Sequence, residues 1–180
     1  MKTILVPTDF SDNALNAANY ALRMAAGFNA RMILLHVFQI PVPVGDLPLF
    51  VVTENDMQNQ SMADLKLFRK KMNPHHMPVP IDLMAVQGDV AMEIEKVFKA
   101  SKADLIAVGV KGKNHLEEVI IGSTTHALFN ASRCPVLAIP DGVEYKDIHK
   151  ILIADDHTQE IKVSHEKILK ELYIFLKREK

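Results

Sequence analysis

The sequence has little of three things: cysteine, net charge and long apolar runs. Its single cysteine, Cys134, excludes a disulfide within the chain, which fits a reducing compartment. The formal net charge of −1 argues against a nucleic-acid partner held mainly by phosphate contacts. No apolar stretch approaches the ~18 residues that span a bilayer. The apolar start is too short for a signal peptide and is interrupted by Asp9. We therefore expect a cytoplasmic protein without membrane or nucleic-acid partners.

Short apolar segments alternate with helical patterns along the first 140 residues. The strands are expected at residues 4–6, 32–37, 81–86, 105–108 and 136–139, and the helices at 12–26, 54–72, 88–101 and 122–132. Ser11 is the expected N-cap of the first helix and Gly27 its expected stop. Nearly continuous apolar strands indicate a sheet covered on both faces. The pattern predicts a doubly wound, Rossmann-like α/β fold, with five parallel strands in the order 3-2-1-4-5.

The chain divides into a domain at residues 1–142 and a C-terminal extension at 143–180. Residues 151–158, Ile-Leu-Ile-Ala-Asp-Asp-His-Thr, resemble residues 4–11, Ile-Leu-Val-Pro-Thr-Asp-Phe-Ser. Each is a strand pattern with an aspartate near its end, and each leads into a helical pattern. This favours an extension that is the opening β–α unit of a second copy. A strand–helix extension with chance similarity is the alternative.

Glycines gather after the fourth predicted strand, in the pattern G-x2-G-x9-G-S-T that begins at Gly109. Glycine permits positive φ and close backbone approach, and a helix start offers unpaired N–H groups and a partial positive charge. We therefore expect a phosphate group as the ligand of this segment. The segment contributes Gly109, Lys111, Gly112, Gly122, Ser123, Thr124 and Thr125. The pattern is neither a Walker A loop nor the dinucleotide fingerprint. Turn glycines with a capping serine are the alternative.

The predicted strand order places the ends of the first and fourth strands side by side. Ligands bind at this edge of a doubly wound sheet, where the strand order reverses. Asp9 follows the first strand and Gly109 follows the fourth. Asp9 would then face a ribose or a metal ion. A simple turn or cap is the alternative role for this aspartate.

Other chemistry-bearing residues give weaker signals. The loop pair His75 and His76 could bind a metal ion, but it lacks a nearby third ligand, so solvent-exposed histidines are the favoured interpretation and the metal ligands stay unknown. Cys134 is expected to be a packed residue rather than a nucleophile. Glu117 and Glu118 could orient water, although exposed surface is the favoured reading. We therefore name no catalytic residue.

Residues 2–140 resemble the universal stress protein (UspA-like) family, in its ATP-binding branch. The resemblance is carried by the start of the chain, Lys-Thr-Ile-Leu-Val-Pro-Thr-Asp-Phe-Ser, by Leu35-His36-Val37, by Gly109-x2-Gly112-x9-Gly122-Ser123 and by Cys134-Pro135-Val136. Val90 departs from the family pattern, because many members have the proline of a Gly-x-Pro motif at this position. The C-terminal extension resembles the start of the second module in tandem members.

The resemblance implies bound ATP or a related adenine nucleotide, with Mg²⁺ or Mn²⁺, and a homodimer or tandem pair joined through the last strand. It places the adenosine against Pro7, Thr8 and Asp9, with Asp9 at the ribose, and the adenine against Val37. The ribose and phosphates would bind to the glycine segment, which is the set of residues from Gly109 to Thr125 given above. Val108 is also included among the cofactor-binding residues. The family often has His or Arg at position 111, where Lys111 supplies a point charge.

These observations favour a nucleotide-binding stress-response or regulatory module. A dimeric interaction scaffold that does not use nucleotide is one alternative. An adenylate-forming or ATP-hydrolysing enzyme is another, but the related enzymes commonly carry an S-G-G-x-D-S loop after the first strand. Residues 7–11 here read Pro-Thr-Asp-Phe-Ser and do not match that loop.

Overall fold

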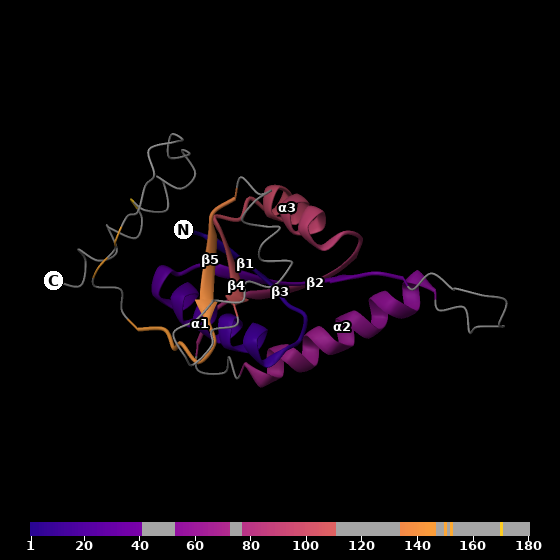
Figure 1. The fold of residues 1–180 in the computed structure, drawn as a ribbon, viewed down its shortest axis with the longest axis horizontal. Helices are drawn as coiled ribbons and strands as arrows, with labels where there is room; N and C mark the ends of the chain where they lie inside the picture. Colours follow the sequence, from indigo (N-terminus) through magenta and orange to yellow (C-terminus); the bar gives the residue numbers. More distant parts are fainter. Residues whose placement is uncertain are drawn as a thin grey trace, which may run out of the picture.

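The computed structural model describes residues 1–40, 53–72, 77–110 and 134–146, together with Lys150, Leu152 and Lys170. Five strands form one parallel sheet in the order β3-β2-β1-β4-β5 (Figure 1), which confirms the predicted topology. The strands are β1 (Thr3–Pro7), β2 (Arg31–Phe38), β3 (Ile81–Gln87), β4 (Leu105–Val110) and β5 (Val136–Pro140), and the helices are α1 (Asp12–Phe28), α2 (Glu54–Lys71) and α3 (Val90–Ser101). The histidine pair at 75–76, the helix expected at 122–132 and the strand–helix unit expected from residue 151 lie outside the described residues.

Helices cover both faces of the sheet. In Figure 1, α3 lies above the sheet, and α1 and α2 lie below it. Successive strand residues point to opposite faces, so Ile4 and Val6 pack toward α1 and α2 whereas Leu5 packs toward α3. This two-sided burial explains why the strands are apolar at nearly every position. Cys134 is buried in the core on the α3 side, as expected of a packed residue.

Helix α1 begins as the sequence predicts but ends later. The Ser11 side chain accepts a hydrogen bond from the backbone N–H of Ala14, which confirms Ser11 as the N-cap. The prediction that Gly27 stops the helix is wrong. Gly27 lies in the last turn, and Asn29 takes the left-handed position, with φ of 51°. Asparagine tolerates that conformation better than most residues, so it can end a helix as glycine does.

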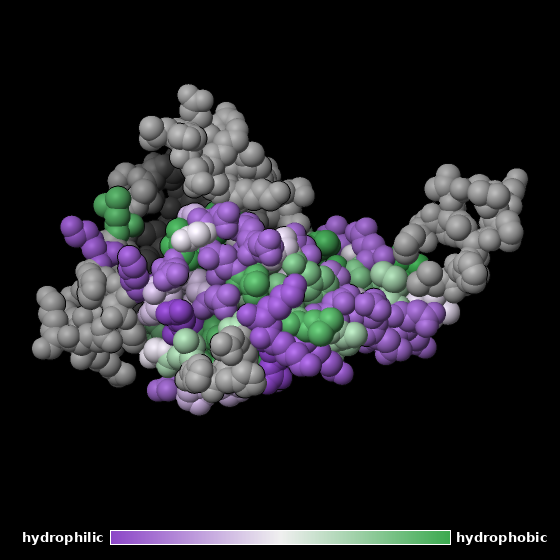
Figure 2. Space-filling view, turned by 90° about the horizontal axis from the view of Figure 1, so that it is seen from below, coloured by the Kyte–Doolittle hydropathy of each residue, from purple (hydrophilic) through white to green (hydrophobic). Residues whose placement is uncertain are grey.

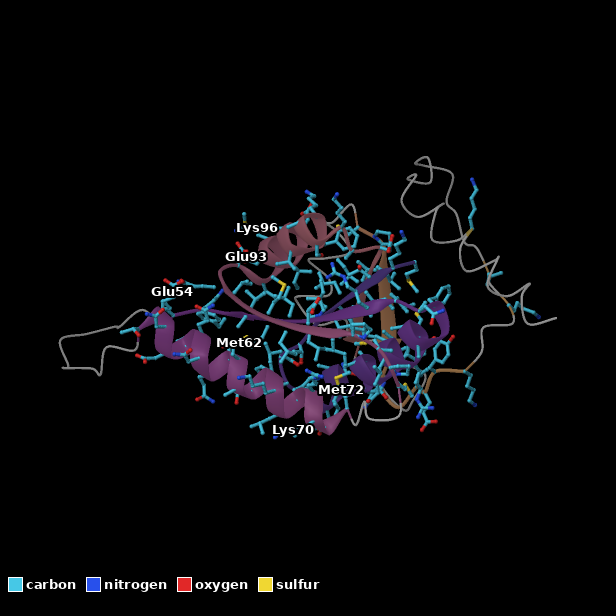
Figure 3. The ribbon with its side chains drawn as sticks, turned by 180° about the vertical axis from the view of Figure 1, so that it is seen from behind. Glu54, Met62, Lys70, Met72, Glu93 and Lys96 are labelled. Atoms are coloured by element: carbon cyan, nitrogen blue, oxygen red, sulfur yellow. The ribbon has the colours of Figure 1, made fainter. Side chains whose placement is uncertain are left out.

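Charge along α2 follows the helix dipole. Figure 3 labels Glu54 and Lys70 toward opposite ends of the helix. Acidic residues occupy the first turn and basic residues the last, which is the favourable arrangement for the partial charges of the helix ends. On α3, Lys96 Nζ lies 3.2 Å from Glu93 Oε1 (Figure 3). These charges favour solvent on the outer sides of the helices and leave the sheet-facing sides for the core.

The surface seen from below, on the side of α1 and α2, is largely polar over the described residues (Figure 2). Hydrophobic residues appear there among polar ones, and Leu67 of α2 is 56% exposed. None of the helices in the described part of the chain is long and apolar enough to cross a membrane.

Candidate functional site

A cavity of about 170 Å³ lies at the carboxyl ends of β1, β2 and β4. Six residues that the sequence assigned to the site line it: Pro7, Thr8, Asp9, Val37, Val108 and Gly109. The other six, Lys111, Gly112, Gly122, Ser123, Thr124 and Thr125, lie outside the described residues. The structure also places residues in the wall that the sequence did not single out as binding residues: Ser11, Asn13, Ala14, Leu35, His36, Val90 and Ile94.

The sheet topology brings the wall together from distant parts of the chain. Strand β1 pairs with β2 on one side and with β4 on the other, and all three run parallel. Their carboxyl ends therefore share one edge, and the strand order reverses next to β1. This is the position at which open α/β sheets bind ligands.

The loop after β1 is fixed by short hydrogen bonds. The Thr8 N–H donates to the Leu35 carbonyl at 2.9 Å, and Thr8 Oγ1 accepts from the Phe10 N–H at 2.9 Å. Phe10 has φ of 65°, a left-handed conformation that is unusual for a bulky residue. Such strain persists where neighbouring contacts hold it, and it is concentrated at functional sites.

Asp9 shapes the entrance to α1 and also lines the cavity. Its Oδ1 accepts hydrogen bonds from the Ser11 N–H at 3.0 Å and from the Ser11 hydroxyl at 2.6 Å. This is the turn role that the sequence offered as the alternative for Asp9. The carboxylate is nevertheless exposed at the cavity wall. The turn therefore holds a negative group where a polar part of a ligand could contact it.

His36 braces the same loop from β2. Its Nδ1 lies 2.8 Å from the Thr8 carbonyl oxygen. A carbonyl can only accept, so this contact assigns the proton to Nδ1 and leaves Nε2 as an acceptor in the neutral ring. The His36 ring centroid lies 4.3 Å from that of Phe10, which in turn contacts Phe68 at 5.9 Å. The sequence could have indicated His36 as a site residue, because it stands next to Val37 at the end of an apolar strand.

Gly109 has a packing role that its sequence context did not suggest. The expectation that the fourth strand ends at residue 108 is wrong, because β4 continues to Val110 and Gly109 pairs with Ile139 of β5. A Cβ atom built on it would lie 2.6 Å from the backbone oxygen of Asn13. Glycine is required here because α1 packs tightly on β4.

The cavity has an apolar part and a polar part. Leu35, Val37, Val90, Ile94 and Val108 provide the apolar lining. The polar side chains come from the loop after β1, the first turn of α1 and His36. Ligand sites combine these two features, since apolar walls bury flat surface and a few polar groups fix orientation. Within the residues that the structure describes, no group of three or more His, Cys, Asp or Glu side chains could hold a metal ion.

A profile of the Universal stress protein family matches residues 1–140. The chain belongs to the universal stress protein family. Universal stress protein MJ0531 of Methanocaldococcus jannaschii is 30% identical over 141 residues, which cover 77% of this chain and 81% of that protein. The predicted resemblance is therefore confirmed at the level of the family.

Solved universal stress proteins share the fold. Universal stress protein UspA from Lactobacillus plantarum aligns with a TM-score of 0.60 at 25% identity, over 77% of this chain and 97% of that one. A universal stress protein crystallised in complex with cAMP aligns with a TM-score of 0.57 at 19% identity, over 77% of this chain and 96% of that one. These alignments agree with the five-stranded parallel sheet of this universal stress protein.

Proposed function

We propose that this universal stress protein binds ATP, or a related adenine nucleotide, in the cavity at the ends of β1, β2 and β4. The observation that supports the proposal is the meeting of six residues in one cavity wall. The family resemblance assigned Pro7, Thr8, Asp9, Val37, Val108 and Gly109 to a nucleotide, and all six line the cavity although they come from three strands and a loop.

The shape and chemistry of the cavity suit a nucleoside. Its apolar lining would bury the faces of a base, and Asp9 would accept a hydrogen bond from a ribose hydroxyl. The volume of about 170 Å³ is below the roughly 300–1,000 Å³ of complete small-molecule sites. We therefore assign the adenosine to the described walls. The phosphates are assigned to the segment from Lys111 to Thr125, with Mg²⁺ or Mn²⁺ as the proposed counter-ion.

A related fold supports an adenine ligand. The universal stress protein crystallised with cAMP shows that this fold can accommodate an adenine nucleotide. We propose that nucleotide occupancy regulates a homodimer formed through β5, which is an edge strand of the described sheet. We also propose that residues 1–142 form the nucleotide-binding domain and that residues 143–180 are the start of a second module. We further propose a cytoplasmic location.

The first experiment asks whether the purified protein carries a nucleotide. Release by denaturation and mass analysis would identify it, and titration of the emptied protein with ATP, with and without Mg²⁺, would measure affinity. We expect bound or binding ATP. A well-folded protein that does not bind ATP would contradict the proposal and favour the nucleotide-independent scaffold.

A matched pair of variants locates the ligand in this cavity. Asp9→Asn and Asp12→Asn each remove one negative charge near the start of α1, but only Asp9 lines the cavity. Loss of a charged hydrogen bond of about 1.5–3 kcal/mol predicts roughly 10- to 100-fold weaker ATP binding for Asp9→Asn. Asp12→Asn should bind like the wild type. Equal affinities for both variants would place the nucleotide elsewhere.

The glycine segment needs its own variant. Gly122→Val should block the approach of phosphate to the start of the helix expected at 122–132, while leaving the fold largely intact. Circular dichroism and the unfolding temperature would verify the fold. Retained ATP affinity in a folded Gly122→Val protein would contradict the assignment of the phosphates to this segment.

A further inference from the structure

One polar atom in the cavity wall has no hydrogen-bond partner among the described residues. The side-chain Oδ1 of Asn13 is buried and accepts no hydrogen bond within the described structure. Buried side-chain oxygens in folded proteins are nearly always paired, so an unpaired one calls for an explanation. Asn13 lies in the first turn of α1 and lines the cavity. A ligand group is therefore a candidate for the missing donor.

The next asparagine on the helix shows the contrast. Asn16 lies one turn further along α1, and its Nδ2 donates to the Pro140 carbonyl oxygen at 3.0 Å. That amide ties α1 to the end of β5 and does not line the cavity. Two asparagines on one helix therefore differ in a single respect that matters here, since one contacts the protein and the other borders the ligand cavity.

The neighbours of Asn13 indicate which part of the nucleotide its side chain would contact. The amide packs against Gly109, because a Cβ on Gly109 would lie 3.0 Å from Asn13 Cγ. Asp9, the proposed ribose contact, lines the same cavity. The apolar lining formed by residues such as Val37 and Val90 is left for the base. The Asn13 amide is thus placed with the polar groups, where the sugar would lie.

A hydroxyl is also the best chemical match for this amide. An adenine amine only donates and a phosphate oxygen only accepts, whereas a hydroxyl does both. It can pair with the amide in either of its two orientations about the last side-chain torsion. We propose that Asn13 hydrogen-bonds a ribose hydroxyl and makes the cavity selective for ribonucleotides over deoxyribonucleotides. This inference rests on the proposed nucleotide function.

The test compares ATP with 2′-deoxy-ATP and 3′-deoxy-ATP by titration of the full-length protein. We expect wild type to bind ATP about tenfold more tightly than at least one of the two analogues, the loss that follows when a buried amide is left unpaired. Asn13→Ala should weaken ATP binding to the level of that analogue and abolish the preference. Asn16→Ala, the matched control, should keep the wild-type preference.

A second variant guards against misfolding. Asn13→Asp keeps an acceptor of the same shape, so it should retain the ratio of affinities even where the added negative charge weakens binding of all three nucleotides. A wild-type protein without preference, or an Asn13→Ala protein that keeps it, would overturn the inference while leaving ATP binding intact. Absence of ATP binding in the wild type would reject the proposed function and this inference together.

Discussion

Gly109 of β4 and Asn13 of α1 lie so close that a single added Cβ atom would sit 2.6 Å from the Asn13 backbone oxygen. Real Cβ contacts are essentially never that short, and the obstacle is backbone rather than a flexible side chain. The contact lies in the wall of the cavity. The packing of helix on strand and the shape of the candidate site are therefore set by the same pair of residues.

Gly109→Ala should separate α1 from β4. Overpacking of this kind costs typically about 1–3 kcal/mol, and we expect that loss in the free energy of unfolding measured with urea. ATP affinity should fall as well, because the cavity wall moves. Gly142→Ala is the control: its φ of 72° disfavours alanine, but its Cβ would meet nothing within 4 Å. It should lose stability without losing affinity. Wild-type stability in Gly109→Ala would show that α1 can shift freely.

His36 should control the loop after β1 through one hydrogen bond. His36→Ala removes the donor to the Thr8 carbonyl and the ring contact with Phe10, and we expect about 1–3 kcal/mol less stability. ATP affinity should fall because Thr8 and Asp9 lose their support. His36→Asn places an amide donor near the former Nδ1 and should recover part of the affinity. Equal affinities in the two variants would mean that the hydrogen bond does not position the loop.

The start of α2 should make stability depend on acidic pH. Hydrogen bonds from the Thr53 side chain and backbone lower the pKa of Asp56 below its ordinary value of 3.8. The ionised carboxylate is thus favoured in the folded state, so its contribution is present above the ordinary pKa and is lost as pH falls through the lower folded value. Thr53→Val should reduce this acid dependence in denaturant titrations at several pH values. An unchanged pH profile would contradict this role of the hydrogen bonds between Thr53 and Asp56.

Tyr20 should act at the alkaline end. Its ring packs edge-on against Tyr145 at 5.2 Å, and burial raises its pKa above the ordinary value of 10.0. The folded protein therefore holds the phenol proton more tightly than the unfolded chain. The resulting stability is complete below the ordinary pKa and is lost as pH rises through the higher folded value. Tyr20→Phe should flatten this alkaline decline in thermal unfolding curves. An identical decline in both proteins would assign it to another group.

The sequence alone was sufficient for the architecture. Apolar strands buried on both faces, separated by helical patterns, predicted the parallel sheet and its strand order, and Ser11 was found as the cap of α1. These features are local or follow from general rules of βαβ topology. The end of α1 was wrongly predicted at Gly27. The helix continues to Phe28 because Asn29, rather than the glycine, takes the left-handed conformation that ends it.

The sequence predicted only part of the candidate site. Motif positions predicted Asp9 and Val37, whose meeting in one cavity follows from the shared edge of parallel strands. Only the tertiary structure decided that Gly109 serves close packing and that His36 braces the loop. It also decided that Asn13 lines the cavity with an Oδ1 that has no hydrogen-bond partner among the described residues. The sequence determined the fold through the periodic burial of its side chains, whereas these roles depend on distances between residues far apart in the chain, which periodicity does not encode.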